Sequence, residues 1–403
     1  MRASTDHFSV YVHVPFCARK CPYCDFNTYA VAKVPEDEYV NTLLKELALY
    51  RHDPSFTGRQ VKTVFFGGGT PSILSDASIS RIIGEINNSF GIVSGAEITL
   101  EANPNDAARE KLSGFKQGGV NRLSFGVQSF DAKALNFLGR DHNPDDITKA
   151  VDTSIAVGLD NLSVDIIYGL PDQSVSALEK DLRAAVSLPI NHLSTYSLTI
   201  EPGTPFYQRQ ERGFLKMPAD SRVSKMLDMI PVFLRDAGFQ RYEISNYSKP
   251  ERESIHNLAY WSGGDYLGIG AGAHSYLGHY SSESESATCV FLGSALRWSN
   301  IALPASYIAG LGTEKAVVAW REELNINALY FEFFYLGMRR AIGVSESEFI
   351  ERFGVAIPSH LQGVINELTT DGFVSQSDGR ISLTSRGVAL ADSVFERISD
   401  VGA

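Results

Sequence analysis

Three cysteines near the amino terminus, Cys17, Cys21 and Cys24, are the residues of this chain best suited to inorganic chemistry. They span only eight residues, so their thiolates can converge on one inorganic centre. A structural zinc ion would need a fourth protein ligand, and the remaining candidates are His13 and the distant Cys289. Three thiolates suit a four-iron cluster that leaves one iron free for an outside ligand. Structural zinc and isolated buried thiols are the alternatives.

A second set of candidate residues lies where short apolar runs end. One run leads into Gly67-Gly68-Gly69-Thr70, and the others end at or near Glu101, Gln128, Asp165 and Glu201. In barrel-type α/β folds, functional side chains collect at the carboxyl ends of the strands. The glycines allow the backbone to approach a ligand closely. A phosphate-binding loop is disfavoured because no Gly-Lys-Ser/Thr follows.

The apolar runs themselves predict the elements that position these residues. Amphipathic stretches of helical period separate the runs, and this alternation predicts a parallel sheet covered by helices. Six such units are too few for a closed eight-stranded barrel but enough for a partial one, so the predicted fold is α/β with a partial (β/α)6 barrel. The six predicted strands are Val10–Val14, Val61–Phe66, Ile98–Glu101, Leu123–Val127, Leu162–Ile167 and Leu193–Ile200.

The rest of the chain predicts two further regions. Residues 246–313 are rich in Gly, Tyr and Ser and contain a polar loop at residues 281–288. The glycines of residues 268–274 superficially resemble a dinucleotide fingerprint, but they lack a strand–turn–helix context and an acidic residue downstream. Residues 314–403 predict helices and then a hairpin at Ser377-Asp378-Gly379-Arg380, the pattern of a winged helix. We therefore expect three regions: 1–245, 246–313 and 314–403.

Composition excludes several classes of protein. The 403 residues include 36 Lys and Arg against 47 Asp and Glu, and the net charge of −11 argues against a binder of nucleic acid. No apolar run approaches the roughly 18 residues of a membrane span. Met1–Val10 contains no apolar run of signal-peptide length. With only 4 cysteines, three of them clustered, a disulfide framework is disfavoured, and we expect a cytoplasmic protein with reduced thiols.

The spacing Cys-x3-Cys-x2-Cys, with Tyr23 before the last cysteine, resembles the radical SAM superfamily. The longer string YVHVPFCARKCPYCDF is similar to the branch that contains oxygen-independent coproporphyrinogen III oxidase and HemW-type heme chaperones. This resemblance implies that Cys17, Cys21 and Cys24 hold a [4Fe-4S] cluster whose open iron binds S-adenosylmethionine (SAM). It also implies a SAM site formed by Tyr11, Tyr23, Gly67, Gly68, Gly69, Thr70, Glu101, Gln128, Arg140 and Asp165. A carboxylate suits the ribose hydroxyls, and Arg140 suits the SAM carboxylate because it can donate a bidentate pair.

Two features separate the members of that branch. The oxidases carry a further cysteine where this chain has Phe26, which puts oxidase activity in doubt. The element His256-Asn257-Leu258-Ala259-Tyr260-Trp261 matches the HNxxYW element of the heme chaperones. Imidazole is a common axial ligand of heme iron, so His256 is a candidate heme ligand, with a backbone-satisfying structural histidine as the equal alternative.

The resemblance therefore implies a heme chaperone that binds heme and transfers it to an acceptor protein. A membrane-bound respiratory hemoprotein is the acceptor that the family suggests. The alternative function is a radical SAM oxidoreductase that decarboxylates a porphyrinogen. The sequence assigns no catalytic side chain and no role to Cys289. It leaves the oligomeric state and the cleavage of SAM open.

Overall fold

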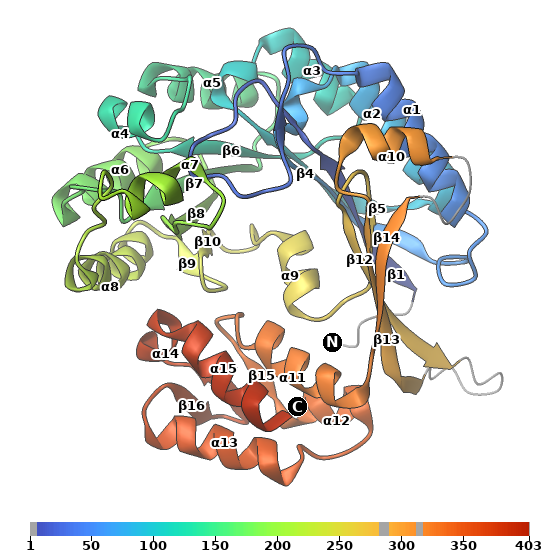
Figure 1. Cartoon of the computed structure of the whole chain (residues 1–403), viewed down its shortest axis with the longest axis vertical. Helices are drawn as coiled ribbons and strands as arrows, with labels where there is room; N and C mark the ends of the chain where they lie inside the picture. The colour runs from blue at the N-terminus through green and yellow to red at the C-terminus, as the bar shows by residue number, and fades with distance from the viewer. Residues whose placement is uncertain (1–5, 282–289, 312–316, 403) are drawn as a thin grey trace.

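The computed structural model describes residues 6–281, 290–311 and 317–402. One open sheet of twelve strands forms its framework, in the order β14-β13-β12-β11-β1-β4-β5-β6-β7-β8-β10-β9. The central part is parallel and, in spatial order, consists of β11 (Tyr266–Ile269), β1 (His7–Val14), β4 (Gln60–Gly68), β5 (Ile92–Ala102), β6 (Arg122–Gln128), β7 (Leu162–Tyr168) and β8 (His192–Ser197). Because the sheet curves but keeps two free edges, the predicted partial barrel is confirmed (Figure 1).

Antiparallel strands extend both edges of the parallel part. Beside β11 lie β12 (His274–Ser281), β13 (Val290–Asn300) and β14 (Val318–Leu324), and beside β8 lie β10 (Asn246–Ser248) and β9 (Gln240–Arg241). Within the glycine-rich residues 268–274, Gly270–Ala273 form the turn between antiparallel β11 and β12. No helix follows β11 there, so the dinucleotide fingerprint is absent.

Helices cover the outer face of the barrel (Figure 1). They begin at polar caps: the Ser75 hydroxyl accepts from the Ser78 amide, and Asn143 forms a capping box with Asp146. The outer helices are α1 (Glu36–Tyr50), α2 (Asp76–Phe90), α3 (Arg109–Gln117), α5 (Pro144–Ala156), α6 (Val175–Ser187) and α8 (Asp220–Asp236). The short helices α4 (Ala132–Phe137) and α7 (Pro205–Glu211) pack in a separate hydrophobic cluster that Tyr23 also contacts.

Residues along each barrel strand alternate between the two faces of the sheet. On β1, Val10, Val12 and Val14 belong to the hydrophobic core under the helices, whereas Tyr11 and His13 hydrogen-bond to each other on the inner face. The inner face also carries buried polar side chains from the neighbouring strands, including Ser9, Thr63, Glu97, Arg122, Ser163 and His192. The barrel interior is therefore unusually polar, and all the candidate ligand-binding groups of β1 and β4–β7 project from this face or from the strand ends.

Residues 246–313 are more regular than the sequence suggested. They include α9 (Ile255–Trp261), α10 (Pro304–Gly310) and the strands β10, β11, β12 and β13 of the main sheet. Leu267, Ile269, Trp298 and Tyr307 from this region pack in the same hydrophobic core as the barrel strands. The polar loop at residues 282–288 and Cys289 lie outside the described residues. The proposed boundaries at residues 245 and 313 stay predictions.

The carboxyl-terminal domain has a core of its own, which includes Phe334, Phe349, Leu361, Ile365 and Ile398. Its order of elements is that of a winged helix: α11 (Ile326–Gly337), β15 (Val344–Ser345), α12 (Glu346–Phe353), α13 (Ser359–Thr370), β16 (Val374–Ser377), β17 (Arg380–Leu383), α14 (Ser385–Ala389) and α15 (Ala391–Gly402). The predicted hairpin turn is confirmed, because Asp378 and Gly379 both take positive φ, at 52° and 72°. Among the described residues, no helix is long and apolar enough to cross a membrane.

Candidate functional site

The three cysteines lie in the loop that follows β1. Cys17 ends β2 (Phe16–Cys17), which pairs with β3 (Tyr29–Ala30), and Cys21 and Cys24 lie between these two short strands. All three thiols are free. Their sulfurs contact polar groups: the Thr70 hydroxyl donates to Cys17 Sγ at 3.5 Å, and Arg140 Nη1 donates to Cys21 Sγ at 3.5 Å. These donors would stabilise thiolates, the form in which cysteine binds metal.

The donor set fits a cluster better than a single ion. Among the described residues, no three His, Cys, Asp or Glu side chains lie close enough together to hold one metal ion. His13, the alternative zinc ligand, is already engaged, because its Nε2 lies 3.0 Å from the Asn27 carbonyl oxygen and its Nδ1 lies 3.0 Å from the Tyr11 hydroxyl. A four-iron cluster needs no such convergence, since each thiolate binds a different iron.

The glycine-rich end of β4 is packed tightly against β1 and the cysteine loop. A Cβ on Gly68, whose φ is 108°, would lie 2.5 Å from the His13 ring, and one on Gly69 would lie 2.6 Å from the Phe16 carbonyl oxygen. The amides of Gly69 and Thr70 donate to the carbonyls of Val14 and Phe16 at 2.8 and 2.9 Å. Glycines are thus required here because the end of β4 packs directly against the backbone of β1 and the cysteine loop. The same close packing brings the Thr70 hydroxyl to Cys17 Sγ.

Two partly buried carboxyl groups, Glu101 and Asp165, face the barrel interior near the cysteine loop. Burial, with a further contribution from the nearby Asp165 charge, raises the pKa of Glu101 to about 8. Burial likewise raises the pKa of Asp165, against hydrogen bonds from Ser194 and Ser124. Burial and the charge of Glu101 also raise the pKa of Tyr11. This end of the barrel therefore favours neutral acids, and a cationic ligand beside them would restore their charged forms.

Arg140 and Gln128 meet above Gly126. Arg140 Nη2 donates to the Gly126 carbonyl at 2.8 Å and also contacts Asn103 Oδ1. A Cβ on Gly126 would lie 3.1 Å from Gln128 Nε2 and 3.3 Å from Arg140 Nη2. Gln128 has a φ of 70°, an uncommon conformation for a non-glycine residue, and such strain is concentrated at functional sites.

Tyr23 completes this group of residues within the cysteine loop. Its ring packs near Phe206 of α7, at 6.3 Å between centroids, and the Phe206 amide donates to the Pro22 carbonyl at 3.0 Å. Burial, together with the neighbouring Cys21, raises the pKa of the Tyr23 hydroxyl. The structure therefore brings the predicted residues of β1 and β4–β7, Arg140 and the cysteine loop together at the carboxyl ends of the strands, which we call the cluster end of the barrel.

His256, on α9, lies toward the opposite, amino-terminal ends of the strands, because its ring contacts Thr63 in the first half of β4 and its amide donates to Glu97 of β5. Figure 1 shows α9 inside the curve of the sheet. Only 1% of the surface of His256 is exposed. Its Nδ1 lies 2.8 Å from the Thr63 hydroxyl, and its ring stacks on Phe65 at 5.0 Å and meets Tyr260 edge-on at 4.8 Å. Burial, with a further contribution from the charge of Arg122, lowers the pKa of His256 to about 3. We call this region the plug end.

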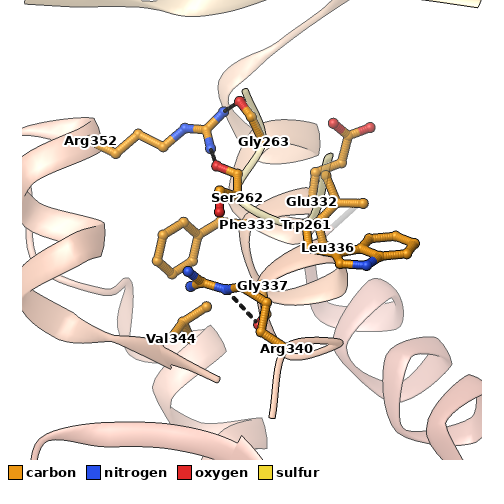
Figure 2. Close-up of a pocket in the computed structure, with 10 residues that line it drawn as sticks. All are labelled: Trp261, Ser262, Gly263, Glu332, Phe333, Leu336, Gly337, Arg340, Val344 and Arg352. Atoms are coloured by element: carbon orange, nitrogen blue, oxygen red, sulfur yellow. Dashed lines mark hydrogen bonds between the residues drawn. The ribbon is translucent and has the colours of Figure 1, made fainter. Parts of the chain in front are cut away.

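The carboxyl-terminal half of the HNxxYW element contacts the carboxyl-terminal domain. Figure 2 shows a pocket in which Trp261, Ser262 and Gly263 face residues of α11 and α12. Arg352 Nη1 and Nη2 donate to the Ser262 and Gly263 carbonyls, each at 3.4 Å, and the Arg339 guanidinium lies 4.9 Å from the centre of the Trp261 ring. Helix α9 therefore connects the barrel interior with this domain.

Comparison with known proteins agrees with this architecture. Residues 11–185 match the radical SAM superfamily, and residues 325–390 match the HemN C-terminal domain. The chain is 35% identical to the heme chaperone HemW of Bacillus subtilis over 96% of this chain and 98% of that protein. It is also 35% identical to HemW of Escherichia coli over 96% and 97%. The chain belongs to the HemW family of the radical SAM superfamily.

A solved structure supports the fold. The radical SAM enzyme coproporphyrinogen III oxidase (HemN) of Escherichia coli superposes with a TM-score of 0.78 over 97% of this chain and 89% of that one, at 22% identity. Radical SAM membership implies a [4Fe-4S] cluster and SAM. The side chain of Phe26, in the cysteine loop, is 64% exposed.

Sequence reasoning missed several residues that build the site. Asn27 Nδ2 donates to the carbonyls of Ala271 and Ala302, at 3.0 and 2.9 Å, and so ties the cysteine loop to the β11–β12 turn. Glu97 binds the beginning of α9, since its carboxylate accepts from the amides of Ile255 and His256 at 3.1 and 2.9 Å. The sequence could have pointed to Glu97, because a charged residue inside a buried strand usually has a partner. No local sequence pattern pointed to Asn27.

Proposed function

We propose that this protein is a heme chaperone that carries a [4Fe-4S] cluster and SAM, binds heme and transfers it to an acceptor protein. One observation carries this proposal: identity of about one third with HemW proteins extends over nearly the whole chain, including both the barrel and the carboxyl-terminal domain. A membrane-bound respiratory hemoprotein is the acceptor class we propose, with the exchange taking place in the cytoplasm.

Cys17, Cys21 and Cys24 would hold the cluster. When bound, the cluster supplies one iron without a protein ligand, at which SAM can be chelated. The protein contributes the hydrogen bonds from Thr70 and Arg140 to two of the sulfurs, which lower the cost of three adjacent thiolates.

The cluster end also fits SAM electrostatically. SAM carries a sulfonium and an ammonium, and the raised pKa values of Glu101 and Asp165 identify a place where positive charge would be stabilised. Arg140 offers its guanidinium to the SAM carboxylate, and Gln128 offers an amide beside it. Around these groups we place Tyr11, Tyr23, the three glycines Gly67–Gly69 and Thr70 as the remaining lining of the SAM site.

The oxidoreductase alternative lacks support from the residue at position 26. A phenyl ring cannot replace a thiol in redox, acid–base or metal chemistry. The proposal therefore assigns the cluster and SAM to a protein whose cargo is heme.

A paired assay tests this function. The full chain is reconstituted anaerobically with iron and sulfide and then given heme in one sample, and coproporphyrinogen III, SAM and a reductant in another. We expect heme to remain bound through gel filtration and the porphyrinogen to remain unconverted. Stoichiometric formation of protoporphyrinogen would reject the chaperone function.

Cysteine variants provide the control for the cluster. Cys21→Ser should lose the iron–sulfide absorption, and Cys289→Ser should retain it. Zinc without iron in the reconstituted wild-type protein would reject both functions together.

A further inference from the structure

His274 is an exposed histidine at the edge of the barrel interior. It is the first residue of β12 and directly follows the Gly270–Ala273 turn. Its imidazole makes no hydrogen bond to any described residue, in contrast to the rings of His13, His192 and His256, which are buried and hydrogen-bonded. An exposed imidazole with no protein partner is free to bind a ligand.

The sheet register places His274 in line with an exposed tryptophan. His274 pairs with Ser299 of β13, and Ser299 pairs with Trp320 of β14, so the three side chains project from one face. Trp320 is 45% exposed. Two strand spacings separate it from His274, roughly 10 Å, a distance that one flat macrocycle can bridge.

That face continues into the barrel interior. Tyr276 lies two residues after His274 and therefore on the same face, and its ring stacks on that of Tyr266, which in turn meets Tyr260 of α9. Next to His274 is Gly268, where an added Cβ would lie 1.9 Å from the His274 carbonyl oxygen. Gly268 also pairs with Tyr11 of β1, and its lack of a side chain lets the backbone of β12 approach β11 closely beside His274.

The turn before His274 is held rigidly from α1. The Glu46 carboxylate accepts from the Gly270 amide at 2.8 Å and from Asn300 Nδ2 at 2.6 Å. The Tyr39 hydroxyl accepts from the Ala271 amide at 3.0 Å and donates to the His13 carbonyl at 2.8 Å. A fixed backbone reduces the entropy lost when the imidazole binds a ligand.

The same turn contacts the cysteine loop. Asn27, which directly follows Phe26, donates to the Ala271 carbonyl at 3.0 Å. The exposed Phe26 ring, the cysteine loop and the turn that precedes His274 are thus continuous in space, which places the face of His274 and Trp320 beside the proposed cluster.

We propose that His274 is the axial ligand of the heme iron and that Trp320 packs against the porphyrin. The inference rests on the proposed heme-chaperone function and assigns its heme site. It departs from the prediction that His256 is the ligand: the His256 ring is enclosed by Phe65, Tyr260 and Thr63, and a macrocycle would have to displace α9 to reach it. His274 requires no such movement.

Heme titration of the reconstituted full chain tests the assignment, with the Soret absorption band and electron paramagnetic resonance of ferric heme as readouts. His274→Ala should weaken heme binding about tenfold or more, about 1.4 kcal/mol, and should remove the signature of imidazole ligation. Added free imidazole should restore that signature. His360→Ala, which removes another exposed histidine, should leave both readouts unchanged.

A second pair of variants tests the macrocycle contact. Trp320→Ala should weaken binding, whereas Trp320→Phe, which keeps a flat ring, should stay close to wild type. Circular dichroism establishes that each variant folds. Unchanged affinity and ligation in His274→Ala, or loss of ligation in a folded His256→Ala alone, would overturn the assignment. If the wild-type chain itself binds no heme, the chaperone function fails instead.

Discussion

The two ends of the barrel use the same strands and the same inner face for opposite purposes. At the plug end, several buried polar groups have partners within the chain: Glu97 accepts from the backbone of α9, and His192 lies between Ser163 and Tyr242, at 2.7 and 2.8 Å. His256 Nε2 and Arg122 Nε are buried there without a hydrogen bond to the described residues. At the cluster end, burial raises the pKa values of Glu101 and Asp165, and the charge of Arg122 only partly opposes this for both residues. The contrast separates a structural polar core from a surface prepared for a charged ligand.

Helix α9 shows how the plug end is built. It has only seven residues, too few to be stable alone, so its amino end depends on Ser254 and Glu97 and its carboxyl end on contacts with the carboxyl-terminal domain. The HNxxYW element therefore has a structural role in addition to any role with heme: His256 packs inside the barrel and Trp261 packs under Arg339.

The largest expected effect comes from breaking the plug end. Glu97→Gln removes a buried charge that lies 4.0 Å from Arg122 and that accepts the first amides of α9. We expect the free energy of unfolding to fall by about 3 kcal/mol, because Arg122 is left buried without this partner. Urea unfolding followed by circular dichroism measures the loss.

A surface ion pair supplies the matched control. Glu179 pairs with Arg183 at 2.7 Å on the exposed side of α6. Glu179→Gln should cost less than about 0.5 kcal/mol. Equal unfolding midpoints for the two glutamine variants would show that the Glu97 contact with α9 does not stabilise the protein.

The second prediction concerns pH. The pKa of buried His256 is lowered to about 3. Between pH 6.5 and 5 the unfolded chain protonates this imidazole and the folded chain does not, so stability falls as pH falls, by about 2 kcal/mol over that interval from this group. The variant His256→Gln should lack this part of the fall in the free energy of unfolding between pH 6.5 and pH 5.

The comparison between wild type and His256→Gln isolates the effect, since the other buried histidines contribute equally to both proteins. Unfolding free energies at pH 6.5 and pH 5, measured with the cluster in place, give the difference. Parallel pH dependences for the two proteins would mean that the ring is accessible to protons, and would reopen His256 as a ligand.

The contrast between the ends also explains what the sequence could predict. The sequence could predict that Cys17, Glu101 and Asp165 lie near one another, because parallel strands bring their carboxyl ends to one edge. Their roles toward a cluster and SAM rest on the cysteine spacing and the family resemblance and stay predictions. The paired groups of the plug end depend on which strand lies beside which helix, and no local pattern places Glu97 against α9. Likewise, β11 has only four residues in a glycine-rich segment, and its pairing with β1 became visible only in the fold.

The smallest effect sharpens the comparison at the cluster end, where one hydroxyl contacts one sulfur. Thr70 donates to Cys17 Sγ at 3.5 Å, and a hydrogen bond to a ligating sulfur stabilises the more negative, reduced cluster. Thr70→Val should lower the midpoint potential by roughly 40 mV, which corresponds to about 1 kcal/mol for one electron.

Thr70→Ser keeps the hydroxyl and should restore most of the potential. Anaerobic redox titration of both variants, at equal iron content, measures the shift. If valine and serine gave the same potential, the Thr70 hydroxyl would not act on the cluster, and its contact with Cys17 would serve only to join β4 to the cysteine loop.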